Sequence, residues 1–157
     1  MGDPADMVDL YYEDVVVGDG CETVAHTVTM DDILGFAAVT RDRHPLHTDP
    51  DYCSRTEFGR PIAHGLYGLS LIEGLKSELK LYENTSIASL GWDKVSFRAP
   101  AFVGDRLHVR MRFLAKRESR DPSRGVVTEG VELVNQDGRV VVTGEHITMV
   151  KRRPAAP

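Results

Sequence analysis

Residues 36–75 read FAAVTRDRHPLHTDPDYCSRTEFGRPIAHGLYGLSLIEGL and place a polar loop between two apolar helical patterns. Four acidic or imidazole side chains fall within eight positions of that loop: Asp42, His44, His47 and Asp49. Pro45 interrupts regular backbone hydrogen bonding and biases His44 toward an extended conformation. Because such a loop can direct side chains into a cleft, we expect any chemical site to lie here.

A long helix is predicted directly after this loop, from about His64 to about Tyr82. Its leucine and isoleucine residues recur at spacings of three and four, the pattern of a helix with one buried face. We interpret His64 as a residue that caps the helix or packs at its start. Before the loop, Thr29 and Asp32 resemble a capping box and predict a shorter helix. A further short helical segment is expected at Asp51 to Phe58.

The second half of the chain is predicted to form strands. Apolar and polar residues alternate from Leu107 to Phe113, which is typical of a strand with one buried face. Three more strands are expected at roughly Ile87 to Arg98, Val126 to Asn135 and Val140 to Val150, and Asp137-Gly138 indicates a hairpin turn. One long helix with antiparallel strands is an α+β arrangement, in which a sheet of five or more strands buries one face against the helix.

The beginning of the chain is also expected to be extended. Tyr11 to Val17 is short and rich in β-branched residues, and Thr23 to Met30 favours the same structure. Gly18-Asp19-Gly20 is predicted to form a turn between them. At the other end, we interpret Lys151 to Arg153 as the start of a flexible, solvated tail at about residues 151–157.

Composition favours one folded domain spanning residues 1–157. The chain has 41% hydrophobic and 27% charged residues, and 157 residues suffice to bury a core. A net charge of −5 disfavours nucleic acid as the main partner, because such proteins usually carry a basic face. Cys21 and Cys53 are too few for a disulfide scaffold. The N-terminus lacks a secretory pattern and no segment has transmembrane length, so we expect a cytoplasmic protein without a membrane partner.

Several motifs, in order, resemble the MaoC-like or hydratase 2 branch of the hotdog-fold proteins. They are Asp42-x-x-Pro45-Leu46-His47-x-Asp49, Pro61-Ile62-Ala63-His64-Gly65 before a long helix, and the segment from Val95 to Asp105 with its Pro100 and Gly104-Asp105. The resemblance implies a hotdog fold, a sheet wrapped around a central helix, and a homodimer or higher homo-oligomer. It also implies reversible hydration of a trans-2-enoyl-CoA to an (R)-3-hydroxyacyl-CoA.

By the same resemblance, Asp42 and His47 are the catalytic pair and the Gly65 backbone N–H binds the thioester carbonyl. Hydration requires a proton to leave water near the β-carbon and another to reach the α-carbon, while negative charge grows on the thioester oxygen. Two titratable groups and one donor meet these needs. A coenzyme A thioester is then the substrate, and no metal or redox cofactor is expected.

Three positions depart from the family pattern, in which many members read Gly-Asp-x-Asn-Pro. Arg41 replaces the glycine and His44 replaces the asparagine, although a ring nitrogen of His44 can form the hydrogen bond that asparagine would form. Glu73 stands on the helix where some hydratases have a small polar residue. These departures leave the acyl group undetermined, as well as the choice between coenzyme A and acyl carrier protein.

Other interpretations stay open at this point. His44, His47, Asp42 and Asp49 form a set that can ligate a metal, but Pro45 and the absence of a helical His-x-x-x-His pattern disfavour it. A hotdog thioesterase would hydrolyse the same thioester on a similar scaffold. A non-catalytic hotdog assembly partner is the third alternative, and the presence of both Asp42 and His47 argues against it.

Overall fold

The computed structural model describes residues 7–154 of the 157-residue chain. The elements run along the chain in this order: η2 (Tyr12–Asp14), β1 (Gly20–Glu22), β2 (His26–Thr27), α1 (Met30–Thr40), α2 (Pro45–Thr48), α3 (Pro50–Cys53), α4 (Gly65–Glu78), β3 (Ser86–Phe97), β4 (Arg106–Glu118), β5 (Arg124–Val134) and β6 (Val140–Lys151). The predicted α+β class is confirmed.

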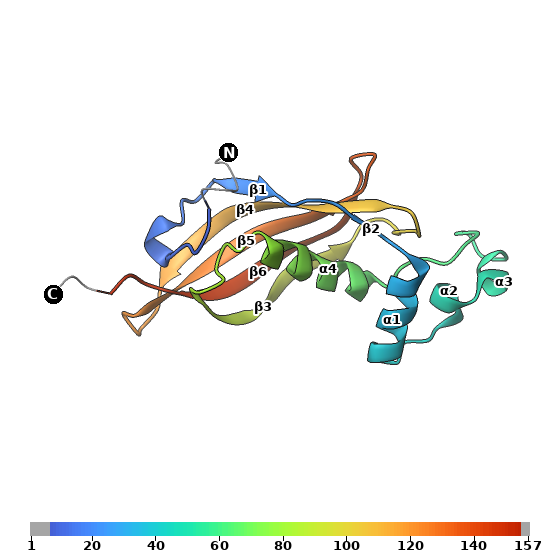
Figure 1. The fold of residues 1–157 in the computed structure, drawn as a ribbon, viewed down its shortest axis with the longest axis horizontal. Helices are drawn as coiled ribbons and strands as arrows, with labels where there is room; N and C mark the ends of the chain where they lie inside the picture. Colours follow the sequence, from blue (N-terminus) through green and yellow to red (C-terminus); the bar gives the residue numbers. More distant parts are fainter. Residues whose placement is uncertain (1–6, 155–157) are drawn as a thin grey trace.

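A six-stranded antiparallel sheet curves around α4 (Figure 1). Its strand order is β1-β4-β5-β6-β3, and the short β2 pairs with β4. Helix α4 contacts β4, β5 and β6, while α1, α2 and α3 lie together beyond one end of the sheet. The N-terminal end of α4 therefore meets the loop that joins α1 to α2.

The core lies between α4 and the sheet. On β4 the alternating Leu107, Val109, Met111 and Phe113 are buried, as their period-two pattern predicts. Gly68 brings α4 close to the strands, since a Cβ at this position would lie 3.0 Å from the Val142 side chain. Both cysteines are buried free thiols, which agrees with the expectation that the chain has no disulfide scaffold.

All four long strands lie where the sequence predicts them, and the turns at Gly104 and Gly138 have positive φ angles. The Thr29–Asp32 capping box is present at the start of α1. Helix α4 ends at Glu78 rather than near Tyr82, because Lys80 adopts a left-handed conformation (φ 57°). The predicted helix at Asp51 to Phe58 is only the one-turn α3.

Two predictions for the chain ends are wrong. Tyr11 to Val17 is not a strand; it contains the short 3-10 helix η2, and β1 begins inside the predicted turn. Lys151 closes β6, and ion pairs join Arg152 to Glu13 and Arg153 to Asp14. Residues 151–153 are thus held on the body of the protein, whereas residues 155–157 lie outside the described range. Among the helices described, none has the length and apolar character to cross a bilayer.

Candidate active site

Asp42 follows the turn at which α1 ends. The C-cap residue of α1, Arg41, has a φ of 69°, the left-handed conformation that usually belongs to glycine at this position. The turn places Asp42 at the exposed rim of the site, where its carboxylate accepts a hydrogen bond from the His44 backbone N–H at 3.3 Å. This geometry explains why a glycine suits the position of Arg41.

His47 is carried by α2, a single helical turn within the segment predicted to be a loop. Pro45 occupies the first turn of α2, and the Nδ1 atom of His44 caps it by accepting the Leu46 N–H at 3.1 Å. A ring nitrogen of His44 does form a hydrogen bond, and its equivalence to the bond of an asparagine stays a prediction. The Nδ1–H of His47 donates to the Ile62 carbonyl at 2.7 Å, which leaves Nε2 with its lone pair. Burial lowers the pKa of His47.

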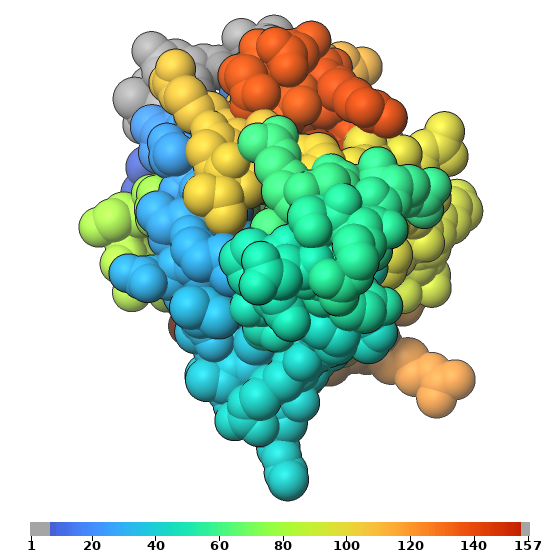
Figure 2. Space-filling model, turned by 90° about the vertical axis from the view of Figure 1, so that its right-hand side faces the viewer, coloured from blue at the N-terminus to red at the C-terminus, as the bar shows by residue number. Residues whose placement is uncertain are grey.

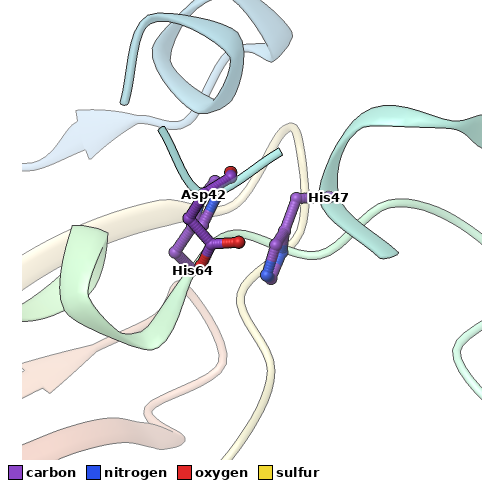
Figure 3. Close-up of side chains that lie close together, drawn as sticks. All are labelled: Asp42, His47 and His64. Atoms are coloured by element: carbon purple, nitrogen blue, oxygen red, sulfur yellow. Dashed lines mark hydrogen bonds between the residues drawn. The ribbon is translucent and has the colours of Figure 1, made fainter. Parts of the chain in front are cut away.

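His64 joins Asp42 and His47 in one cluster (Figure 3). One nitrogen or oxygen atom from each of the three side chains lies within 4.8 Å of the others. The Nε2–H of His64 donates to the Asp42 carbonyl at 2.9 Å, and its ring stacks on that of His47 with centroids 3.8 Å apart. His64 does pack at the helix start as predicted, but its side chain makes no capping bond.

Gly65 is the first residue of α4, so its N–H belongs to the helical turn that has no intrahelical acceptors. A Cβ at Gly65 would lie only 2.8–3.0 Å from ring carbons of Phe97. Beside it is a cavity of about 450 Å³ whose walls include Asp42, His64, Gly65, Phe97 and Val142. Seen from this end, the segment from α1 to α3 forms much of the surface (Figure 2).

The four-residue metal set considered from the sequence does not assemble. The carboxylate of Asp49 instead caps α3 by accepting hydrogen bonds from the Asp51 and Tyr52 N–H groups. The Nδ1 atom of His44 caps α2 by accepting the Leu46 N–H. The structure groups Asp42 and His47 with His64, a donor set that can also chelate a divalent ion. The expectation that no metal is needed stays a prediction.

A second group of charged side chains lies near the other end of α4. Lys76 contacts the fully buried Glu129 at 2.5 Å and Glu73 at 2.9 Å. The Nζ of Lys76 also lies 3.0 Å from Nδ1 of His146, so one ammonium group binds three partners. Glu73, the third departure from the family pattern, thus takes part in a charge network distant from Gly65.

Comparison with known proteins now assigns the family. The model of the MaoC like domain matches residues 14–135. The chain belongs to this family. Over 116 residues it is 36% identical to an (R)-specific enoyl-CoA hydratase of Aeromonas caviae, covering 74% of this chain and 81% of that protein. It is 31% identical over 147 residues to a 3-hydroxybutyryl-CoA dehydratase of Methylorubrum extorquens, and this match covers 94% of this chain and 88% of that protein.

Solved structures of hotdog proteins have the same fold as this chain. The MaoC-like dehydratase from Rhodospirillum rubrum superposes with a TM-score of 0.82 at 31% identity, covering 92% of this chain and 99% of that one. A Mycobacterium tuberculosis protein described as a double hotdogfold superposes with a TM-score of 0.81 over 94% of this chain and 46% of its own, at 21% identity. The predicted hotdog fold is confirmed.

Proposed function

We propose that this MaoC-like protein catalyses the reversible hydration of a trans-2-enoyl-CoA to an (R)-3-hydroxyacyl-CoA. The observation that carries the proposal is that Asp42 lies beside His47 and lines one cavity together with Gly65 at the helix start. Relatives with hydratase and dehydratase names support it. The family's reaction needs two proton-transferring groups and one oxyanion donor, and the candidate site contains these groups.

In this mechanism, Asp42 and His47 act on one water molecule. His47 is neutral at Nε2, because its other nitrogen donates to Ile62 and burial lowers its pKa. The water oxygen attacks the β-carbon while one of its protons passes to the pair, and the pair returns a proton to the α-carbon. No net proton is consumed.

The Gly65 N–H receives the thioester oxygen as negative charge develops on it. A backbone donor at a helix N-terminus is fixed before the reaction and lies at the positive end of the helix dipole. Glycine leaves this donor accessible, whereas a Cβ would press against Phe97. A donor of this type typically contributes about 10²–10³ in kcat.

A panel of enoyl-CoA thioesters tests the proposal by loss of conjugated absorbance. Stereospecific appearance of the (R)-3-hydroxy product is expected, without added cofactor and after prolonged EDTA treatment. Free thiol release without hydration would favour the thioesterase alternative, and inactivity on every thioester would favour the assembly partner. Activity lost in EDTA and restored by zinc would favour a metal at Asp42, His47 and His64.

The pH dependence follows from the lowered pKa of His47. The general base must be neutral, and the pKa of this residue lies below the ordinary 6.5. As pH falls, activity should therefore persist below pH 6.5 before protonation of His47 removes it. An acid limb in kcat/KM centred above pH 6.5 would contradict the assignment of His47 as base.

We also propose that two copies pair through β3. This strand is at the end of the sheet path and exposes four large apolar side chains: Ile87, Leu90, Val95 and Phe97. An unpaired strand edge with apolar side chains is a surface that favours pairing with another chain. A partner there would also cover Phe97 beside Gly65. Light scattering that shows only monomer at micromolar concentration would reject this proposal.

A further inference from the structure

We infer that His64 is a positioning residue that holds Asp42, His47 and Gly65 in one fixed arrangement. The inference deepens the proposed hydration and rests on it. His64 is 4% exposed, follows the polar loop in sequence, and touches each of the three candidate groups in a different way. Three contacts make up this role: a hydrogen bond to Asp42, a ring contact with His47 and the peptide group shared with Gly65.

The hydrogen bond fixes the loop that carries Asp42. Residues 38–44 are all exposed, so burial does not hold this loop against the rest of the protein. The 2.9 Å bond from His64 Nε2–H to the Asp42 carbonyl ties the loop to a buried ring. That ring is itself held by the Phe36 ring, whose centroid is 5.0 Å away. Losing the donor would leave the Asp42 carboxylate free to move relative to the cavity.

The ring contact fixes the plane of His47. One edge of the His47 ring is held by the 2.7 Å bond to Ile62, and one face lies on the His64 ring at an interplanar angle of 26°. A hydrogen bond alone permits rotation about its axis, whereas an adjacent ring face blocks it. The two contacts together direct Nε2 of His47 toward one place.

The peptide group links His64 to the oxyanion donor. The Gly65 N–H belongs to the same planar unit as the His64 carbonyl, and His64 occupies the N-cap position with φ −59° and ψ 141°. Anchoring the His64 side chain therefore sets the direction of the Gly65 N–H. Distances between the acid–base pair and the oxyanion donor thus depend on one residue.

The electrostatic influence of His64 on His47 supplies a readout that packing does not. The groups that affect His47 are the Ile62 carbonyl, Asp42, His64 and His44. Burial is the largest influence and lowers the pKa of His47; a positive charge on His64 lowers it further, and Asp42 raises it. Replacing His64 by an uncharged ring should therefore raise the pKa of His47.

Two variants separate the contacts. His64→Phe keeps a ring against His47 but removes the donor to Asp42, and His64→Gln keeps a donor but removes the ring. We expect kcat to fall about 10²-fold in His64→Phe, the scale of a ~1 Å misplacement. His64→Gln should lose about tenfold, since part of the positioning remains. KM should change far less than kcat in both variants, because the other residues that line the cavity are kept.

His108→Phe is the matched control, since it makes the same replacement on β4 outside the cavity, and it should leave kcat unchanged. Thermal melts verify that each variant folds, and NMR titration of the His47 ring measures its pKa without any substrate. Folded His64→Phe protein with kcat within about threefold of the unaltered chain and an unshifted His47 titration would overturn the inference. If the unaltered chain hydrates no thioester, the proposed function fails; the inference is then overturned if His64→Phe leaves the NMR signals of the Asp42 loop, the His47 ring and the Gly65 N–H all unchanged.

Discussion

Substituting alanine at Gly65 tests the oxyanion donor with the least possible change in the chain. The new Cβ would lie 2.8, 2.9 and 3.0 Å from three ring carbons of Phe97. Carbon atoms normally make contact at about 3.5–4.0 Å, so the ring must retreat by about 0.7 Å or more. In a single copy of the chain Phe97 is 54% exposed and free to move outward, so the free energy of unfolding of the monomer should change by less than ~1 kcal/mol.

Activity should respond much more strongly than stability. The methyl group and the displaced ring both stand where the thioester oxygen must approach the Gly65 N–H. Loss of such a donor costs about 10²–10³ in kcat, or about 2.7–4 kcal/mol in the barrier. Steady-state hydration of an enoyl-CoA by the folded variant measures this loss.

Gly74→Ala is the matched control in the same helix. No heavy atom lies within 4 Å of a Cβ at Gly74, so alanine is accommodated without any displacement. It should raise the free energy of unfolding by ~0.5–1 kcal/mol, because glycine is the poorer helix former, and leave the rate unchanged. If Gly65→Ala kept kcat/KM within about threefold of the unaltered chain, the Gly65 N–H would not be the oxyanion donor.

Three further predictions concern the catalytic pair, the buried charges and the turn before the site. Asp42→Asn and His47→Gln should each lower kcat by ~10²–10⁴, and the double variant should cost little more than the worse single one, whereas multiplied losses would show independent roles. Lys76→Met or Glu129→Leu alone should cost ~3–5 kcal/mol in urea unfolding by removing the nearest opposite charge from a buried one, while both together should cost less than the worse single change; an equal loss in the double variant would contradict this. Arg41→Gly should raise the free energy of unfolding by ~1 kcal/mol, because the left-handed conformation costs arginine more than glycine, and a decrease in thermal melts would refute that reason.

The sequence predicts the four long strands because the signals for them are local. Alternation on β4 needs only one strand and one buried face, and the hairpin at Asp137-Gly138 is set by its own residues. Tyr11 to Val17 has equally strong strand propensity, yet Tyr12 packs against β5 at Gly125, where a Cβ would collide with its ring. A contact between residues more than a hundred positions apart overrides the local preference there, so no local pattern could predict it.

The candidate site also contains residues that the sequence indicates and one whose role only distant contacts reveal. Asp42, His47 and Gly65 come from a family resemblance, and the fold places all three at the cavity end of α4. His64 is different, because its significance depends on the Asp42 carbonyl 22 residues before it and the His47 ring 17 residues before it. The sequence offered only its position beside Gly65 as a signal. Whether such a residue caps a helix or holds a loop is decided by tertiary contacts.

Helix α4 carries both Glu73, which departs from the family pattern, and Gly65, whose N–H is the proposed oxyanion donor. Its N-terminus supplies the proposed donor, Gly68 sets its distance from β6, and Lys76 fastens it to Glu129 on β5. Because a helix moves largely as one body, the charge network limits how far the Gly65 N–H can shift relative to the sheet. Glu73 satisfies one of the three hydrogens of the buried Lys76 ammonium, so this residue contributes to anchoring the helix. The position that departs from the family pattern is thus explained by the packing of α4, at a distance from the reacting atoms.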